Sequence, residues 1–197
     1  MKYSIIDTIY LCVCVIRSKL ISSNIRLIRF PIDLRGRQYI NFGRNFTTGR
    51  YCRLEVYENN GVKPVLKIGD DVQINDFVHI TVMDSVTIGN NVLIASHAYI
   101  SDCQHGHYSG MIQSSPESPP AKRNHEISPV IVEDNVWICD QVCVLPGVVI
   151  GKGSIIGANS VVTKSIPPGS IAVGSPAVVI KKWDYRTNSW VKCNVKH

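Results

Sequence analysis

The chain has 197 residues, of which 45% are hydrophobic, and a formal net charge of +6. This length supports one domain with its own core, and no linker rich in Ser, Pro or Gly divides the chain in two. The seven cysteines are odd in number and follow no framework spacing, which favours free thiols and a cytoplasmic protein over a disulfide-stabilised secreted one. No nucleic-acid partner is expected.

Residues 1–35 are expected to form an N-terminal segment that contains an amphipathic helix, which ends before Pro31. Aliphatic residues recur at steps of four, four, three and four, the spacing of one helix face: Ile5, Ile9, Val13, Ile16 and Leu20. The apolar run is too short and too interrupted by charge to span a bilayer, and no clear cleavage site of a signal peptide follows it. Two roles stay open: a helix packed over the open end of the next domain, or a contact with a membrane surface or a partner.

Basic residues are concentrated at the front of the chain. Residues 1–53 hold ten Lys and Arg against two acidic residues, a net of +8, whereas the remainder has a net of −2. A basic front end favours an anionic lipid or an anionic glycan carrier, and the alternative is a solvated face. Peripheral contact with the inner face of the membrane is therefore one expectation for this segment.

Residues 36–180 carry a six-residue repeat. Aliphatic residues recur every six positions in three runs: Ile68, Ile74 and Ile80; Ile88, Ile94 and Ile100; and Val132, Ile138, Val144, Ile150, Ile156 and Val162. Neither a helix nor an ordinary strand demands this period, whereas a solenoid with one hexapeptide per flat face buries one aliphatic side chain per face. The period predicts an all-β parallel β-helix of about five coils and leaves its hand open.

Two segments depart from the repeat. The longest irregular stretch, residues 103–129, interrupts the repeats between Ile100 and Val132 and contains Pro116, Pro119 and Pro120. A long loop inside a compact repeat domain is more often functional than accidental, so this excursion is a candidate site. Residues 181–197 are expected to form a short C-terminal tail.

The candidate catalytic side chains lie where the long loop begins, at residues 101–107 (SDCQHGH). His105 leaves the repeats at an exposed rim, and histidine exchanges protons near neutral pH, which suits a general base. Cys103 as a nucleophile is a weaker alternative because no helix N-terminus or basic neighbour activates it. Asp102 either orients a histidine or ends the coil.

The ordered motifs of residues 65–182 resemble the hexapeptide-repeat acyltransferases. The motifs are TIGNNVLIA at 87–95, His105, NVWI at 135–138, LPGV at 145–148, IGA at 156–158, SVVTK at 160–164, IPP at 166–168 and GSPA at 174–177. They are most similar to the galactoside and maltose O-acetyltransferase branch, and especially to relatives that acetylate bacterial surface polysaccharides such as lipopolysaccharide, capsule or colanic acid. The resemblance implies a left-handed β-helix, a homotrimer with active sites between subunits, and acetyl-CoA as donor.

The resemblance also implies residue roles. His105 matches the catalytic histidine, and Asn75 falls on an asparagine that contacts the acceptor, although it could instead cap a turn of the coil. The residues that match the CoA groove are Trp137, Asp140, Ala158, Thr163, Lys164 and Lys181. For Trp137 a subunit-packing role is an alternative. Cys139, Asp140 and Val178 depart from the family pattern, which affects the fine geometry of that groove.

These observations predict an acetyl-CoA-dependent O-acetyltransferase that acts on a sugar hydroxyl, with His105 as general base and no metal. The acceptor is expected to belong to a bacterial surface polysaccharide or its precursor, in soluble or lipid-linked form. The alternative is an N-acetyltransferase of a nucleotide-linked amino sugar, with the same donor and base. Two further alternatives are a zinc site of His79, His97 and His105, as in the γ-class carbonic anhydrases, and a non-catalytic interaction platform.

Overall fold

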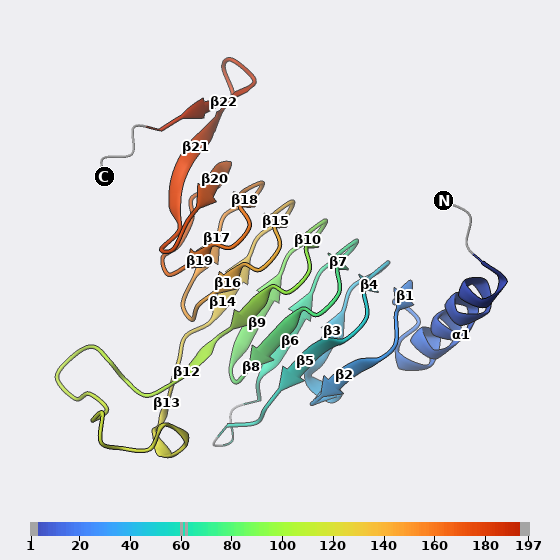
Figure 1. The fold of residues 1–197 in the computed structure, drawn as a ribbon, viewed down its shortest axis with the longest axis horizontal. Helices are drawn as coiled ribbons and strands as arrows, with labels where there is room; N and C mark the ends of the chain where they lie inside the picture. The colour runs from blue at the N-terminus through green and yellow to red at the C-terminus, as the bar shows by residue number, and fades with distance from the viewer. Residues whose placement is uncertain (1–3, 60, 62, 194–197) are drawn as a thin grey trace.

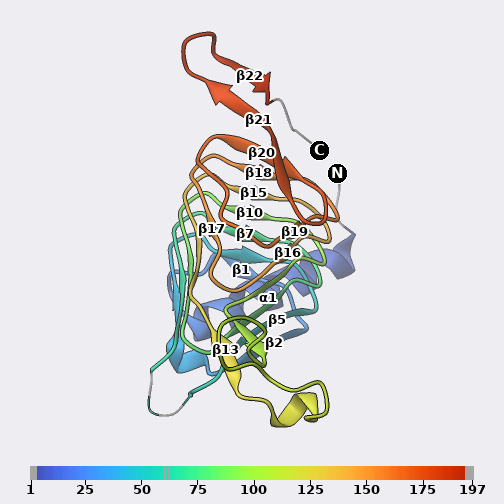
Figure 2. The same cartoon turned by 90° about the vertical axis from the view of Figure 1, so that its left-hand side faces the viewer.

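The computed structural model describes residues 4–59, 61 and 63–193. Three sheets form the sides of a prism, which Figure 1 shows along its length and Figure 2 from one side. Sheet A contains β1 (Leu27–Ile28), β4 (Thr47–Thr48), β7 (Gln73–Ile74), β10 (Leu93–Ile94), β15 (Trp137–Ile138), β18 (Ile155–Ile156), β20 (Ser170–Val173), β21 (Val178–Asp184) and β22 (Ser189–Lys192). Sheet B contains β2 (Ile32–Arg35), β5 (Cys52–Val56), β8 (His79–Val82), β11 (Tyr99–Ser101), β16 (Cys143–Val144) and β19 (Val161–Val162). Sheet C contains β3 (Ile40–Phe42), β6 (Val65–Ile68), β9 (Ser85–Ile88), β14 (Val130–Val132) and β17 (Val149–Ile150).

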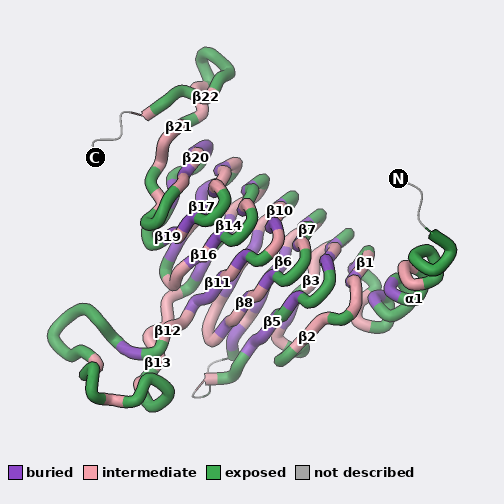
Figure 3. The backbone as a smooth tube through the Cα atoms, viewed as in Figure 1, coloured by how far each residue is buried: buried purple, intermediate pink, exposed green. Residues whose placement is uncertain are grey.

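The six-residue repeat produces this prism because each coil visits sheets A, B and C in turn. Within sheet A, Ile74, Ile94 and Ile138 pair side by side in parallel register. All three are buried, and the residues just before them face outward. Figure 3 shows the result as buried stripes inside every coil. The expected parallel β-helix is confirmed.

The chain turns sharply between sheets, and the turn that leads from A to B is called corner AB here, with corners BC and CA named likewise. Corner CA takes left-handed backbone at Asn45, Asp71, Asn91 and Asn135, residue types that tolerate a positive φ. Corner AB takes the same conformation at the aromatic residues Tyr51 and Phe77 and at His97. Their rings stack, with centroids 5.0 and 4.9 Å apart.

The prism is longer than the repeat pattern indicates. Sheet A holds seven parallel strands from β1 to β20 instead of about five, and β1 and β2 precede residue 36. The missed signal is weak: Ile28, Leu34 and Ile40 also follow at steps of six, but Pro31 interrupts them. After residue 177 the chain turns back, and β21 and β22 form an antiparallel hairpin in the segment expected as a tail.

The expected N-terminal helix is present as α1 (Ile5–Ile21), and it lies beside β1 at one end of the prism (Figure 1). Ser4 and Asp7 form a capping box at its start. Its two buried residues are Cys14 and Ser18, and the Ser18 hydroxyl accepts a hydrogen bond from Ile28 N at 2.7 Å and donates one to Cys14 O at 2.6 Å. The aliphatic stripe that predicts the helix instead faces solvent. Among the described residues no helix has the length and apolarity needed to cross a membrane.

The long excursion leaves the prism at corner BC, as Figure 1 shows. It begins with β12 (Cys103–His105), contains the short 3₁₀ helix η2 (Pro120–Lys122) and returns through β13 (His125–Ile127), which pairs antiparallel with β12. A second 3₁₀ helix, η1 (Arg37–Tyr39), lies between β2 and β3. The excursion therefore has a two-stranded base.

Candidate active site

His105 stands at the base of the excursion with an exposed side chain. It pairs with His125 across β12 and β13, and the two ring centroids are 4.5 Å apart. The Tyr108 hydroxyl donates to the His105 carbonyl oxygen, and Arg123 Nη1 donates to the Tyr108 hydroxyl at 2.8 Å. Within the described residues no hydrogen bond reaches the imidazole nitrogens of His105. The loop thus holds the backbone of this histidine and leaves its imidazole open.

Asp102 stabilises corner BC through hydrogen bonds and does not orient His105. Its buried carboxylate accepts hydrogen bonds from the backbone N–H groups of Met83, Asp84 and Ser85, at 2.8 Å for the last two. Burial raises the pKa of the Asp102 carboxyl, and the three N–H donors oppose that rise. Of the two roles left open for Asp102, the structure supports ending the coil.

Cys103 lacks the surroundings of a reactive thiol. Burial raises the pKa of Cys103, although its contact with the Ser101 hydroxyl, 3.4 Å away, acts in the opposite direction. Because the thiolate is the nucleophilic form, a raised pKa disfavours attack at neutral pH. The structure therefore gives no support to a cysteine nucleophile at this position.

One outward column of sheet A carries two of the predicted cofactor contacts, Trp137 and Lys181. Parallel and antiparallel register align Gln73, Leu93, Trp137, Ile155, Ile171 and Lys181 in that order. The Trp137 side chain is 45% exposed, so its ring is available on the surface of the sheet. The column runs from the coil of Asn75 to the C-terminal hairpin, and Trp137 lies between its ends.

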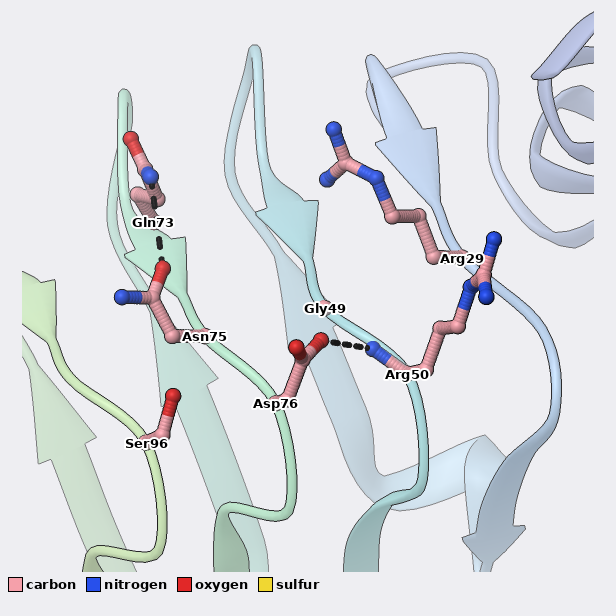
Figure 4. Close-up of a pocket in the computed structure, with 7 residues that line it drawn as sticks. All are labelled: Arg29, Gly49, Arg50, Gln73, Asn75, Asp76 and Ser96. Carbon is pink, nitrogen blue, oxygen red and sulfur yellow. Dashed lines mark hydrogen bonds between the residues drawn. The ribbon is translucent and has the colours of Figure 1, made fainter. Parts of the chain in front are cut away.

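Corner AB continues this surface. Asn75 follows β7, Asp140 follows β15 and Ala158 follows β18, so all three occupy the same corner in different coils. Asp140 and Ala158 are exposed and Asn75 is half-buried. The Asn75 side-chain oxygen accepts a hydrogen bond from Gln73 Nε2 at 3.4 Å (Figure 4). Asn75 thus points toward the outward face and does not cap a turn through this oxygen.

The remaining predicted residues occupy a different corner. Thr163 and Lys164 follow β19 and are exposed in corner BC, the corner from which His105 emerges. Sheet B separates this group from Asn75 and Ala158. A single chain therefore does not bring the histidine to the predicted acceptor contact.

A pocket of about 430 Å³ lies beside Asn75 (Figure 4). Besides Asn75 it is lined by Arg29, Gly49, Arg50, Gln73, Asp76 and Ser96. None of these six stands out in the sequence, because they come from four successive coils and are separated along the chain. Only the stacking of consecutive coils places them together.

The three histidines of the zinc alternative do not converge within one chain. His79 Nε2 lies 2.8 Å from Glu55 Oε2 on sheet B, and His97 stacks on Phe77 in corner AB. His105 lies on the excursion. The described part of the chain contains no group of three or more His, Cys, Asp or Glu residues placed to hold a metal ion.

Known proteins are similar to this chain in sequence and in fold. Residues 129–164 match the family model for the bacterial transferase hexapeptide (six repeats). WbbJ of Escherichia coli, a candidate lipopolysaccharide biosynthesis O-acetyl transferase, is 42% identical over 192 residues, 97% of this chain and 96% of WbbJ. Galactoside O-acetyltransferase of Escherichia coli is 40% identical over 108 residues, 53% of this chain and 48% of that enzyme.

A solved structure establishes the fold. A variant of AntD, an N-acyltransferase from Bacillus cereus in complex with a dTDP-linked amino sugar and coenzyme A, superimposes with a TM-score of 0.68 at 24% identity over 83% of each chain. The expected left-handed parallel β-helix is thereby confirmed. With the near full-length match to WbbJ, these findings show that the chain belongs to the hexapeptide-repeat acetyltransferases.

Proposed function

We propose that the protein transfers the acetyl group of acetyl-CoA to a sugar hydroxyl of a bacterial surface polysaccharide or its precursor. The observation that carries this proposal is the match to a candidate lipopolysaccharide O-acetyl transferase over 97% of the chain. The exposed His105 and the surface of sheet A and corner AB supply the groups that such a reaction needs.

His105 is the general base of the proposed reaction. Its imidazole accepts the proton of the acceptor hydroxyl, which makes that oxygen a better nucleophile toward the thioester carbonyl. The ester bond forms as the thioester C–S bond breaks, and the proton passes from His105 to the departing sulfur, so that CoA is released as the free thiol. The excursion fixes the backbone of the histidine through Tyr108 and Arg123, so the ring stays at the rim when the acceptor arrives. Holding both reactants in one groove supplies the orientation that the two lack in water.

The residues of this chain fit acetyl-CoA, which supplies the acetyl group as a thioester. Trp137 offers an exposed ring on the outward column, Lys181 lies on the same column, and Lys164 is an exposed cation in corner BC. Lysines bind phosphate as point charges. Ala158 adds a small side chain that leaves room at the surface of corner AB.

The active site is proposed to form between the subunits of a homotrimer. The separation of His105 from Asn75 by sheet B supports this assembly, because a site built from both requires corner BC of one copy to meet corner AB of another. Closed cyclic symmetry repeats such a heterologous contact at every interface.

The chemistry is tested by release of free CoA from acetyl-CoA with surface-polysaccharide repeat units and amino-sugar nucleotides as acceptors. His105→Ala is expected to lower turnover by at least ~10²-fold, the lower end for general-base catalysis. Acetyl esters that alkali cleaves support O-acetylation. Stable amides formed only with amino sugars would move the assignment to N-acetylation, and full activity of the His105 variant would remove its proposed role.

The shared site is tested by mixing two inactive variants. His105→Ala and Asn75→Ala proteins are unfolded together at equal amounts and refolded. If each site takes its histidine and its asparagine from different copies, random assortment restores about one quarter of the sites. A mixture as inactive as its two components would show that both residues act from one chain.

Contact with an anionic membrane surface is proposed for α1. Its outward face exposes Ile5, Ile6, Ile9, Val13, Val15, Ile16 and Leu20. An amphipathic helix with basic residues nearby binds such a surface by burying its apolar face, and the front of the chain carries a net of +8. This contact would hold the enzyme at the inner face of the membrane.

The test is co-sedimentation with vesicles of phosphatidylglycerol or of phosphatidylcholine. The wild-type protein is expected to bind the anionic vesicles, and Ile9→Ser with Ile16→Ser to bind them weakly. Val178→Ser, at an exposed position on β21, serves as the control. Equal binding by all variants would place the contact elsewhere.

A further inference from the structure

The pocket beside Asn75 extends from the proposed acceptor contact toward α1, away from Lys181. Its members come from consecutive coils: Arg29 follows β1, Arg50 follows β4, Asn75 and Asp76 follow β7, and Ser96 follows β10. Strands of neighbouring coils lie about 4.8 Å apart. The backbones of Arg50 and Arg29 therefore lie roughly one and two coil spacings from that of Asn75, about 5–10 Å.

Hydrogen bonds and contact with an aromatic ring hold Arg29 and Arg50 in place. Arg29 Nη1 donates to Thr48 O at 3.0 Å. Arg50 Nε donates to the Tyr10 hydroxyl of α1 at 3.1 Å, and its guanidinium carbon lies 4.4 Å from the centre of the Tyr10 ring. Each guanidinium keeps most of its N–H donors after these contacts.

Nearby arginines behave differently. Arg44 pairs with Asp70 at 2.6 Å, and Arg53 pairs with Glu55 at 2.7 Å. Neither Arg29 nor Arg50 forms an ion pair with a described residue. Figure 4 shows both guanidinium groups on the side of the pocket opposite Gln73 and Asn75. Two cations thus line one wall, and among the described lining residues the one carboxylate, that of Asp76, forms no ion pair with either of them.

The rest of the pocket suits a hydroxylated ligand. Its lining has no aliphatic side chain, and the amide groups of Gln73 and Asn75 and the hydroxyl of Ser96 line the side away from the two arginines. The one carboxylate, Asp76, accepts the Arg50 backbone N–H at 2.6 Å and lies against Gly49, where an added Cβ would come within 2.2 Å of Asp76 Oδ1. A volume of about 430 Å³ is within the ordinary size of a small-molecule site.

We infer that this pocket recognises an acidic group, a carboxylate or a phosphate, on the sugar acceptor. Arg29 and Arg50 bind the anion, because guanidinium groups form paired hydrogen bonds with both kinds of acid. Asn75, Gln73 and Ser96 contact the hydroxyls of the same unit. The placement of the reacting hydroxyl near Asn75 rests on the proposed function, whereas binding of the anion does not.

Equilibrium binding to the full-length protein without acetyl-CoA tests the inference. Glucose 1-phosphate and glucuronate are titrated against neutral glucose at low salt, by calorimetry. The wild-type protein is expected to bind at least one acid about ten- to a hundredfold more tightly than glucose, the range of a charge-assisted hydrogen bond. Arg29→Gln and Arg50→Gln are expected to remove most of this preference, and Arg44→Gln, already paired with Asp70, to preserve it.

The outcomes separate this inference from the proposed reaction. Preference for the phosphate alone, or for the uronate alone, identifies which acid the acceptor carries, and both support the pocket. Equal binding of acids and glucose overturns it, as does an acid preference that survives in both Arg29→Gln and Arg50→Gln. Failure of acetyl transfer with intact anion preference would overturn the proposed reaction and leave the anion site standing.

Discussion

The prism and α1 place regularly spaced apolar residues in opposite environments. Ile94 follows the six-residue period and is fully buried, whereas Ile9 follows the helical period and is 60% exposed. In the prism each coil supplies the surface on which the next coil packs. The repeat itself therefore provides a packing partner for every inward aliphatic side chain. A single helix needs a separate surface, and α1 meets β1 through Ser18. Periodicity therefore predicts an element more reliably than it predicts which face is buried.

The largest expected effect is at the centre of the prism. Ile94→Ala removes a side chain packed between Ile74 and Ile138, and we expect a loss of about 2–5 kcal/mol in the free energy of unfolding. Urea denaturation measures it. Leu93→Ala, on the outward side of the same strand, is the control and should cost about 1 kcal/mol or less. Equal losses would mean that inward and outward positions do not differ as the prism requires.

The second prediction concerns Ser18, the polar residue through which α1 contacts β1. Ser18→Ala leaves the buried Ile28 N–H without its acceptor, and we expect a loss of about 1–3 kcal/mol. Thr8→Ala, at an exposed hydroxyl of the same helix, should change stability by less than about 0.5 kcal/mol. If Ser18→Ala is as mild as the control, the Ser18 face does not hold α1 to the prism.

The buried Glu55 carboxylate on sheet B is expected to make the free energy of unfolding depend on pH. Burial by itself would raise the pKa of Glu55, but hydrogen bonds and charges of Arg53 and His79 outweigh burial and hold that pKa below its ordinary value. A lowered carboxyl pKa contributes stability above the unfolded-state pKa and loses it as pH falls through the folded-state pKa. The difference in the free energy of unfolding between wild type and Glu55→Gln should therefore become smaller below pH about 4.5. Urea denaturation between pH 7 and 3 measures this difference, and a difference that stays constant over that range would contradict the prediction.

The smallest expected effect is on the stripe of α1. Ile9→Ser removes an aliphatic side chain that is mostly in water, so we expect the free energy of unfolding to change by no more than about 0.5 kcal/mol. Thermal and urea unfolding of the isolated protein measure this change. A loss comparable to that of Ile94→Ala would show that the stripe is covered in solution, by another subunit or another part of the chain.

Some residues of the candidate site can be predicted from local sequence patterns. Their arrangement in space depends on tertiary packing. His105 was predictable because the repeat stops beside it, and Trp137 and Lys181 because family motifs contain or adjoin them. Their common column on sheet A was not, since it depends on strand register across several coils. Arg29 and Arg50 gave no sequence signal, because only the tertiary structure shows which arginines form an ion pair with a carboxylate and which two lie together in one pocket.

By itself the sequence determined the parallel β-helix, the position of the excursion and the presence of α1, because each follows from a period or its interruption within a short stretch of chain. The tertiary structure decided which face of α1 is buried, that the chain after residue 177 returns as a hairpin, and that His105 and Asn75 lie at different corners. Those outcomes depend on contacts between residues far apart in sequence. A local period carries no information about such contacts, since it reports which side chains share a face and not what that face meets.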